Sequence, residues 1–221
     1  MDLQPIYLSL QLAALATGLL LLLGVPLAYL LTQPRSWIRP FFEAIINLPL
    51  VLPPTVLGFY FLVAFGNGTA LGRWLQEVVG LQLLFSFQGL VLASVLYSLP
   101  FMVNPVYAAL RALPDSLKEA AYVLGYSKWK TFRKVLLPNI RPALLTGSVF
   151  AFAHVLGEFG LVLMIGGNLP GETRLASIAI YDQVEVLNYA GANQYAMVLL
   201  GLSLGILLLA FTVNRKAPRV L

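Results

Sequence analysis

The sequence predicts an all-α integral membrane protein with five transmembrane helices, its N-terminus outside and its C-terminus in the cytoplasm. Three observations predict this fold class: the composition, the length of the uncharged runs and the distribution of basic residues. The 221-residue chain is 59% hydrophobic and 10% charged, whereas soluble domains carry about 25% charged residues. Four uncharged runs, 3–34, 44–72, 78–110 and 186–214, exceed the roughly 20 residues that a helix needs to cross a bilayer.

Helices are expected because they satisfy their own backbone in lipid and the short alternating strands of a barrel are absent. The first helix ends near Pro34 and Arg35, since a proline stops a helix and an arginine anchors it at the membrane surface. The chain is expected to form a single transmembrane domain over residues 1–221. The five expected helices are 8–31, 43–66, 87–111, 141–165 and 192–213.

The second expected helix contains three prolines within six residues, Pro49, Pro53 and Pro54. Proline removes a backbone donor and bends or breaks a helix. In a membrane such a break persists only where protein or a water-filled cavity covers the freed carbonyls. Two interpretations stay open: a packed kink, or a hinge or wall of a conduction path. Pro100 and Asn104 give a weaker signal of the same kind in the third helix.

The fourth expected helix carries the ionisable residues His154 and Glu158. Residues four apart share a helix face, and an ionisable side chain within a span indicates a functional site. They either line a pathway or gate, or form a local structural pair near the outer end of the helix. The chain has no cysteine and no other histidine, so we expect no metal site and no catalytic residues.

A short amphipathic helix is expected over 175–186, after a turn at 168–172. It either lies in the membrane interface or forms part of a docking platform on the outer surface. The fifth helix carries Gly201 and Gly205, a spacing that permits close helix contact.

Basic residues orient the chain. With the N-terminus outside, twelve of the 14 Lys and Arg fall in cytoplasmic segments, and only Arg73 and Arg174 lie outside. This distribution satisfies the positive-inside rule, and the opposite orientation violates it. The net charge of +5 therefore indicates topology and not a nucleic-acid partner.

The longest cytoplasmic segment, about 112–140 with its flanking arginines, holds seven of those basic residues. Ser116 and Glu119 fit a capping box at a helix start, and Gly125 suits the left-handed position that ends a helix. Ser127 is expected to cap a second helix. The segment is thus expected to form two helices around a glycine, and it either docks in the groove of a protein partner or lies on anionic lipid.

The same segment carries a motif: Glu-Ala-Ala, three residues, Gly, nine residues, then Val135, Leu136, Leu137 and Pro138. It resembles the EAA loop of importer-type ABC transporter permeases, in which isoleucine is usual where this chain has Val135. The resemblance implies that a coupling helix in this loop inserts into a cleft of a cytosolic ATPase subunit. The docking residues that it implies are Glu119, Ala120, Ala121, Gly125, Leu137 and Pro138.

The chain has no G-x-x-x-x-G-K-[ST] phosphate-binding loop. We therefore expect a permease subunit and not an enzyme, with no cofactor of its own. ATP and Mg are expected in a separate ATPase subunit. A channel that works without ATP is the alternative of a different class, and it leaves the EAA pattern unexplained.

Three further segments, 48–54, 156–160 and 169–174, resemble the molybdate permease group of bacterial importers, with sulfate and thiosulfate permeases as close relatives. His154 stands where molybdate permeases often carry arginine. The resemblance implies a type I ABC importer permease fold, a homodimer and a bacterial or archaeal cytoplasmic membrane. It also implies two ATPase subunits and an extracytoplasmic molybdate-binding protein.

The resemblance leaves the cargo between molybdate and its alternatives, tungstate or sulfate and thiosulfate. Because a carboxylate repels an oxyanion, neither His154 nor Glu158 is expected to be a high-affinity ligand. The residues expected along the translocation pathway or its gate are Pro53, Pro54, His154 and Glu158.

Overall fold

The computed structural model describes residues 1–33 and 38–215, with side chains placed up to residue 212; this part of the chain is helical apart from its turns. The predicted helix stop at 34–35 and the basic C-terminal tail beyond 215 lie outside the described residues. The long helices are α1 (Gln4–Thr32), α5 (Phe87–Ala112), α9 (Arg141–Leu156) and α12 (Tyr189–Arg215).

Shorter elements join the long helices. In chain order they are α2 (Arg39–Asn47), the 3-10 turn η1 (Leu48–Leu50), α3 (Pro54–Phe65), α4 (Ala70–Glu77), α6 (Asp115–Val123), α7 (Lys128–Thr131), the π-helical turn η2 (Phe132–Leu136), α8 (Leu137–Asn139), α10 (Gly160–Gly166) and α11 (Ala176–Glu185).

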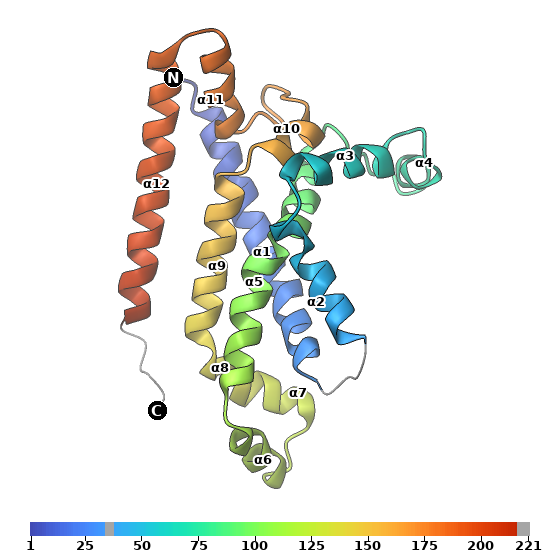
Figure 1. The fold of residues 1–221 in the computed structure, drawn as a ribbon, viewed down its shortest axis with the longest axis vertical. Coiled ribbons are helices and arrows are strands. Elements are labelled where there is room, and N and C mark those ends of the chain that lie inside the picture. Colours follow the sequence, from blue (N-terminus) through green and yellow to red (C-terminus); the bar gives the residue numbers. More distant parts are fainter. Residues whose placement is uncertain (34–37, 216–221) are drawn as a thin grey trace.

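The core lies where α1, α5 and α9 pack together (Figure 1). Met102 of α5 is fully buried between two glycines. A Cβ on Gly24 of α1 would lie 2.9 Å from Met102 Cγ, and one on Gly147 of α9 would lie 3.0 Å from its Sδ. Small residues at these two positions let the helices approach closely, which replaces the missing hydrophobic driving force in lipid.

Among the described residues, three single helices are long and apolar enough to cross a membrane: α1, α5 and α12. They occupy the first, third and fifth predicted positions. Two bent helix pairs raise the number of candidate spans to five if each pair counts as one span: Arg39–Leu50 with Pro54–Phe65, and Lys128–Asn139 with Arg141–Leu156.

The second predicted helix is not continuous. It breaks after η1, and α3 turns 108° away from the direction of α2 and η1, so that α3 runs across the bundle (Figure 1). Pro53 has an extended backbone, with ψ 140°, as a residue before a proline prefers, and α3 begins at Pro54. The predicted break at these prolines is confirmed, whereas the expected single helix over 43–66 is wrong.

The fourth predicted helix is also interrupted. α9 ends at Leu156, and α10 begins only at Gly160. Gly157 is the C-terminal cap, and Phe159 leaves the helical region with φ −128°. A continuous helix over 141–165 was therefore the wrong expectation.

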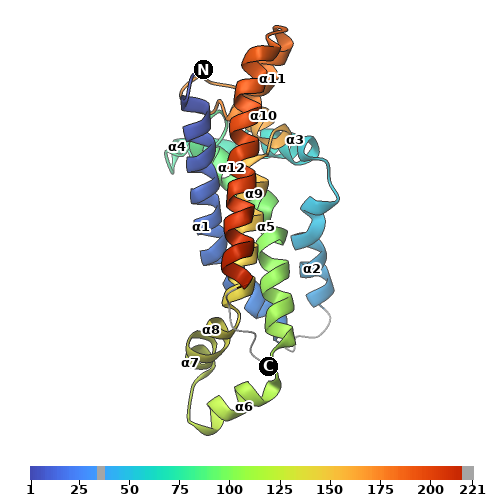
Figure 2. The same ribbon diagram turned by 90° about the vertical axis from the view of Figure 1, so that its left-hand side faces the viewer.

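The segment of α6, α7, η2 and α8 protrudes from one end of the bundle, opposite the end that carries the start of α1 and α11 (Figures 1 and 2). Its helix–glycine–helix design is confirmed: Gly125 has φ +74°, and Ser127 Oγ accepts from Lys130 N at 3.3 Å. The expected capping box is wrong, because α6 begins one residue before Ser116 and no side chain caps it.

The helix expected over 175–186 is present as α11. Ala176, Ile178 and Ala179 are buried, and α11 packs against α12 and α1. Ser9 of α1 accepts a hydrogen bond from Ala176 N at 2.9 Å. This helix is therefore part of the folded domain, and it does not merely lie on the membrane surface.

Candidate functional site

The protruding segment exposes an apolar cluster. Val123 is 87% exposed and Leu124 is 73% exposed at the end of α6, Tyr122 directly before them is exposed, and so is Trp129 of α7. These four residues are called the docking patch below. An exposed cluster of this kind outside the membrane-spanning helices indicates a protein-interaction surface.

The predicted docking residues lie on different sides of this segment. Glu119, Ala120 and Gly125 are exposed, whereas Ala121 is only 3% exposed. Ala121 is thus packed within the chain and is not on the surface beside Ala120.

At the end of the segment, Pro138 is exposed and Leu137 is half-buried. Tyr122 and Val123 were missed as surface residues in the sequence. The sequence pattern that could have identified them is a pair of bulky apolar residues next to the apolar face of α6, in a loop that is otherwise highly charged.

A buried aromatic residue anchors the protruding segment to the bundle. Phe132 of η2 is 3% exposed, and its ring lies 4.4 Å from that of Tyr29 in α1. The π-helical turn leaves the regular hydrogen-bond pattern, and Asn139 Nδ2 donates to the carbonyl of Val135 at 2.7 Å. Single π-turns within helices occur frequently at functional sites. The protruding segment is therefore joined to α1 by the contact between Phe132 and Tyr29.

The two helix breaks meet at one place. A Cβ on Gly160 would lie 3.2 Å from the Cβ of Pro54, and a Cβ on Gly58 would lie 2.7 Å from that of Met164. The start of α3 and the start of α10 are thus in direct contact through glycines. The sequence did not predict that these breaks belong to a single junction.

Glu158 lies in this junction and is 6% exposed. Its Oε1 accepts a hydrogen bond from Leu161 N at 3.1 Å, and its carbonyl accepts one from Ser177 Oγ at 2.6 Å. The residue therefore holds the first turn of α10 and ties it to α11. Glu158 lies beyond the end of α9, so the prediction that it shares a helix face with His154 is wrong.

His154 is half-buried between α9 and α5. Its Nδ1 lies 3.0 Å from Ser98 Oγ, and its ring stacks on Phe101 at 4.1 Å between centroids. No ion pair among the described residues joins it to Glu158. The structural pairing that the sequence left open is not formed, and each residue has its own partners.

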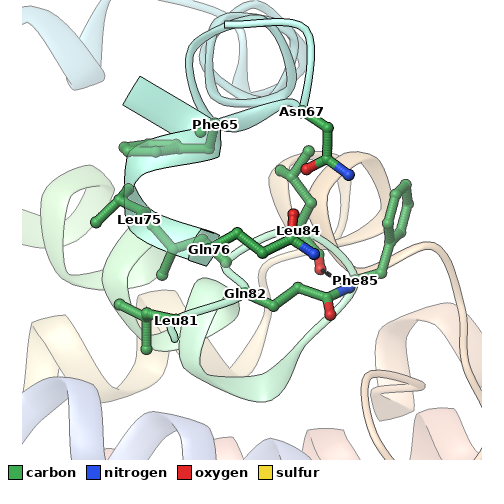
Figure 3. Close-up of a pocket in the computed structure, with 10 residues that line it drawn as sticks. Phe65, Asn67, Leu75, Gln76, Leu81, Gln82, Leu84 and Phe85 are labelled. Atoms are coloured by element: carbon green, nitrogen blue, oxygen red, sulfur yellow. Dashed lines mark hydrogen bonds between the residues drawn. The ribbon is translucent and has the colours of Figure 1, made fainter. Parts of the chain in front are cut away.

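A pocket of about 200 Å³ (Figure 3) lies beside the bundle, in the half that is away from α6 (Figure 1). It lies between the end of α3, α4 and the chain that leads into α5, and amide side chains line it from Asn67, Gln76 and Gln82. Phe85 has φ 57° and donates through its N–H to the carbonyl of Ile165 at 2.8 Å. The pocket presents polar but uncharged groups.

An ion pair fixes the neighbouring turn. Arg174 Nη2 lies 2.7 Å from Asp182 Oδ2, and Asn168 Nδ2 donates to the same carboxylate at 3.0 Å. Thr173 is fully buried and donates to the carbonyl of Gly166 at 2.6 Å. The cation of Arg174 therefore fixes the turn to α11, and its charge is already balanced.

The model of a family described as binding-protein-dependent transport system inner membrane component matches residues 21–220. The molybdenum transport system permease protein ModB of Azotobacter vinelandii is 47% identical over 196 residues, covering 88% of this chain and 86% of that protein. ModB of Escherichia coli K12 is 34% identical, with 98% and 93% covered. The probable sulfate transport system permease protein cysT of Chlorella vulgaris is 38% identical, with 91% and 76% covered.

Solved structures show the same fold. An inward-facing form of the MetNI methionine ABC transporter matches with a TM-score of 0.76 at 20% identity, covering 98% of this chain and 96% of that one. A bacterial ABC transporter that imports alginate matches with a TM-score of 0.77 at 19% identity, covering 99% and 82%. The chain thus has the fold of type I ABC importer permeases, as the resemblance implied.

Proposed function

This chain belongs to the family of binding-protein-dependent transport system inner membrane components, and from that membership we propose that it is the membrane subunit of an ATP-driven molybdate importer. It is a permease subunit and not an enzyme. The proposal places it as a multi-pass protein in a bacterial or archaeal cytoplasmic membrane, with its N-terminus outside and its C-terminus in the cytoplasm.

The observation that carries the coupling part of the proposal is the docking patch. Val123 and Leu124 project from a short helix at one end of the bundle, and both are exposed apolar side chains. Lys128, Lys130 and Arg133 follow in α7 and η2, and all three are exposed and positively charged. A cytosolic ATPase subunit that offers an apolar cleft with an acidic rim fits this surface.

Glu119, Ala120, Gly125 and Pro138 join this docking surface. They are exposed on the same protruding segment. In this proposal Ala121 and Leu137 act from within, because their burial fixes how α6 and α8 are presented. Two permease copies would carry two such segments, one for each ATPase subunit.

The cargo is inferred from the relatives. The molybdenum permease of A. vinelandii is 47% identical to this chain, whereas the sulfate permease of C. vulgaris is 38% identical. Sulfate or thiosulfate is therefore the second candidate cargo, and tungstate is the alternative that shares the size and charge of molybdate.

Passage is assigned to the junction of the two helix breaks and to the neighbouring helix. In this proposal Pro53, Pro54 and Glu158 shape the outer gate, and His154 lies beside the path on α9. ATP binding closes the ATPase subunits, the protruding segments move together, and Phe132 passes this movement to α1. A substrate-loaded binding protein outside delivers the oxyanion to the opened gate.

The test is substrate-stimulated ATP hydrolysis by the complete complex in lipid nanodiscs, with an ATPase and a molybdate-type binding protein. Molybdate-loaded binding protein is expected to stimulate hydrolysis several-fold over the empty form, while sulfate at equal concentration leaves the rate near the basal value. If only sulfate stimulated hydrolysis, the cargo would be sulfate and not molybdate. A chain that forms no complex with any ATPase would contradict the proposal as a whole.

A further inference from the structure

A row of polar side chains runs between α2 and α5, in the half of the bundle that carries α6. Arg39 Nε lies 2.8 Å from Glu43 Oε1, and the Arg39 guanidinium lies 5.3 Å from the centre of the Tyr107 ring. Asn104 Nδ2 donates to Asn47 Oδ1 at 2.7 Å. These five residues are called the polar ladder below.

The polar ladder extends deep into the bundle. Asn47 lies eight residues after Arg39, and Asn104 lies eight residues before the end of α5. At 1.5 Å per helical residue, Asn47 is roughly 12 Å from the start of α2 and Asn104 is roughly 12 Å from the end of α5, the two helix ends that lie nearest α6 (Figure 1). The two helices thus bring their polar groups to the same depth independently.

The polar ladder joins α2 to α5, but the described part of the protomer does not enclose it. α2 buries only Ile46, and the side chains of Arg39 and Glu43 are 28% and 36% exposed. A charged pair and two amides that only joined α2 to α5 would be expected to be buried between them. Partly exposed polar side chains within a span, such as the two amides, face a water-filled path or another subunit, since lipid contact is costly.

The backbone at the same level is also polar. Pro100 and Pro105 lie inside α5 on either side of Asn104. Neither proline has an N–H to donate to the carbonyl four residues before it. Such carbonyls are tolerated at membrane depth where they face protein or water.

We propose that the polar ladder lines one wall of the inner half of the transport path. Its N–H groups donate hydrogen bonds to a tetrahedral, doubly charged oxyanion before the oxyanion is released to the cytosol. This inference rests on the proposed function and names the residues that would contact the cargo. The Arg39 guanidinium has five N–H donors, and its Nε–H bonds Glu43. Asn104 Nδ2 has a second N–H beyond the one that Asn47 accepts.

The charge balance of the polar ladder favours weak binding and release of the oxyanion over tight binding. Glu43 neutralises Arg39, so the oxyanion meets hydrogen-bond donors without a net positive charge. A transport path requires binding that is favourable enough for entry and weak enough for release. An unpaired arginine at the cytoplasmic mouth of the path would hold a dianion too tightly.

The absence of cysteine from the chain permits a direct accessibility test. Asn104→Cys and, separately, Asn47→Cys are placed in the complete complex and treated with a negatively charged, membrane-impermeant thiol reagent from the ATPase side. Both are expected to react in at least one nucleotide state and to be protected by molybdate. The control Leu204→Cys, on the exposed face of α12, is expected to stay unlabelled in lipid, because the thiolate is the reactive form.

A second arm measures the molybdate imported per ATP hydrolysed. Asn104→Asp is expected to lower this ratio by at least about tenfold, because the added carboxylate repels the anion, while Asn104→Gln keeps a donor and most of the ratio. The inference is overturned if both cysteine variants label no faster than Leu204→Cys, or if Asn104→Asp keeps the wild-type ratio. A wild-type complex that imports no oxyanion would instead contradict the proposed function.

Discussion

At the residue scale, Glu158 acts at the meeting point of three helices. One carboxylate oxygen caps the start of α10, and the carbonyl of the same residue is bonded by Ser177 of α11. The sequence indicated that this residue is functional but suggested the wrong partner. His154 four residues earlier was the obvious choice, and only the break at Gly157 turns the carboxylate toward Leu161.

Glu158→Ala removes the cap and is expected to cost about 1 kcal/mol, which lowers the thermal midpoint of the solubilised protein by about 2–4 °C. Molybdate uptake is expected to fall as well, because in the proposed function Glu158 shapes the outer gate. Glu158→Gln keeps an acceptor oxygen, so it is expected to restore both values. A glutamine variant with a normal midpoint but no uptake would show that the negative charge itself is required.

Gly58 is the second residue on which the junction depends. Gly58→Ala places a Cβ 2.7 Å from that of Met164, so α3 has to move away from α10. Overpacking of this kind costs about 1–3 kcal/mol, which thermal unfolding of the solubilised protein would detect. The matched control is Gly201→Ala, where no atom lies within 4 Å of the new Cβ, and its midpoint is not expected to fall, because alanine favours a helix over glycine. Equal midpoints for both variants would contradict the junction.

At the element scale, the sequence predicted the kinds of element better than their continuity. Hydrophobic length alone located α1, α5 and α12, because a helix of that length and composition has few alternatives in lipid. The prolines predicted the helix break before α3. The break after α9 carried only a glycine signal, and the 108° turn of α3 depends on packing against α10, which local sequence does not encode.

The protruding segment shows the same limit at finer detail. The left-handed glycine and the cap by Ser127 were predicted from local chemistry, which acts within a few residues. The division of neighbouring alanines into an exposed Ala120 and a buried Ala121 was not predicted. This division depends on how η2 orients α6. A bulky residue at position 121 would therefore disturb the folding of the segment, and its effect on docking could not be separated from that.

Val123→Asp is the sharper test of docking. Burying a valine or leucine contributes about 1.5–3 kcal/mol, so Val123→Asp and Leu124→Asp are each expected to weaken binding of the ATPase subunit at least tenfold. Co-purification and titration of the ATPase against the variants in nanodiscs would measure this. Leu187→Asp, equally exposed at 71% but at the opposite end of the bundle, serves as the control. ATPase binding that stays unchanged in both patch variants would remove the docking assignment.

At the scale of the whole molecule, the fold separates two tasks at its two ends. The end with α6 carries the apolar docking patch and most of the basic residues of the described chain, and the opposite end carries the junction of broken helices and the amide-lined pocket. Between them, α1, α5 and α9 form a tightly packed core. A movement that starts at the α6 end is therefore expected to reach the junction through α1 and α5, and not to stay within the protruding segment.

The orientation of the whole molecule is checked by single cysteines in intact cells. Leu187→Cys is expected to react with an impermeant reagent added outside, and Val123→Cys only after the membrane is opened. The physical reason is the positive-inside distribution around α6. If Val123→Cys reacted from outside and Leu187→Cys did not, the α6 end would lie outside the cell, and the proposed orientation would be wrong.

The central claim is that this chain imports an oxyanion only when a separate ATPase acts on its protruding segment. Uptake of labelled molybdate into proteoliposomes that hold the complete complex, with ATP on the ATPase side and loaded binding protein on the other, tests it most directly. We predict uptake that requires ATP and that falls at least tenfold when Val123→Asp and Leu124→Asp are combined. Equal uptake without ATP, or undiminished uptake by the combined variant, would contradict the claim and indicate a channel.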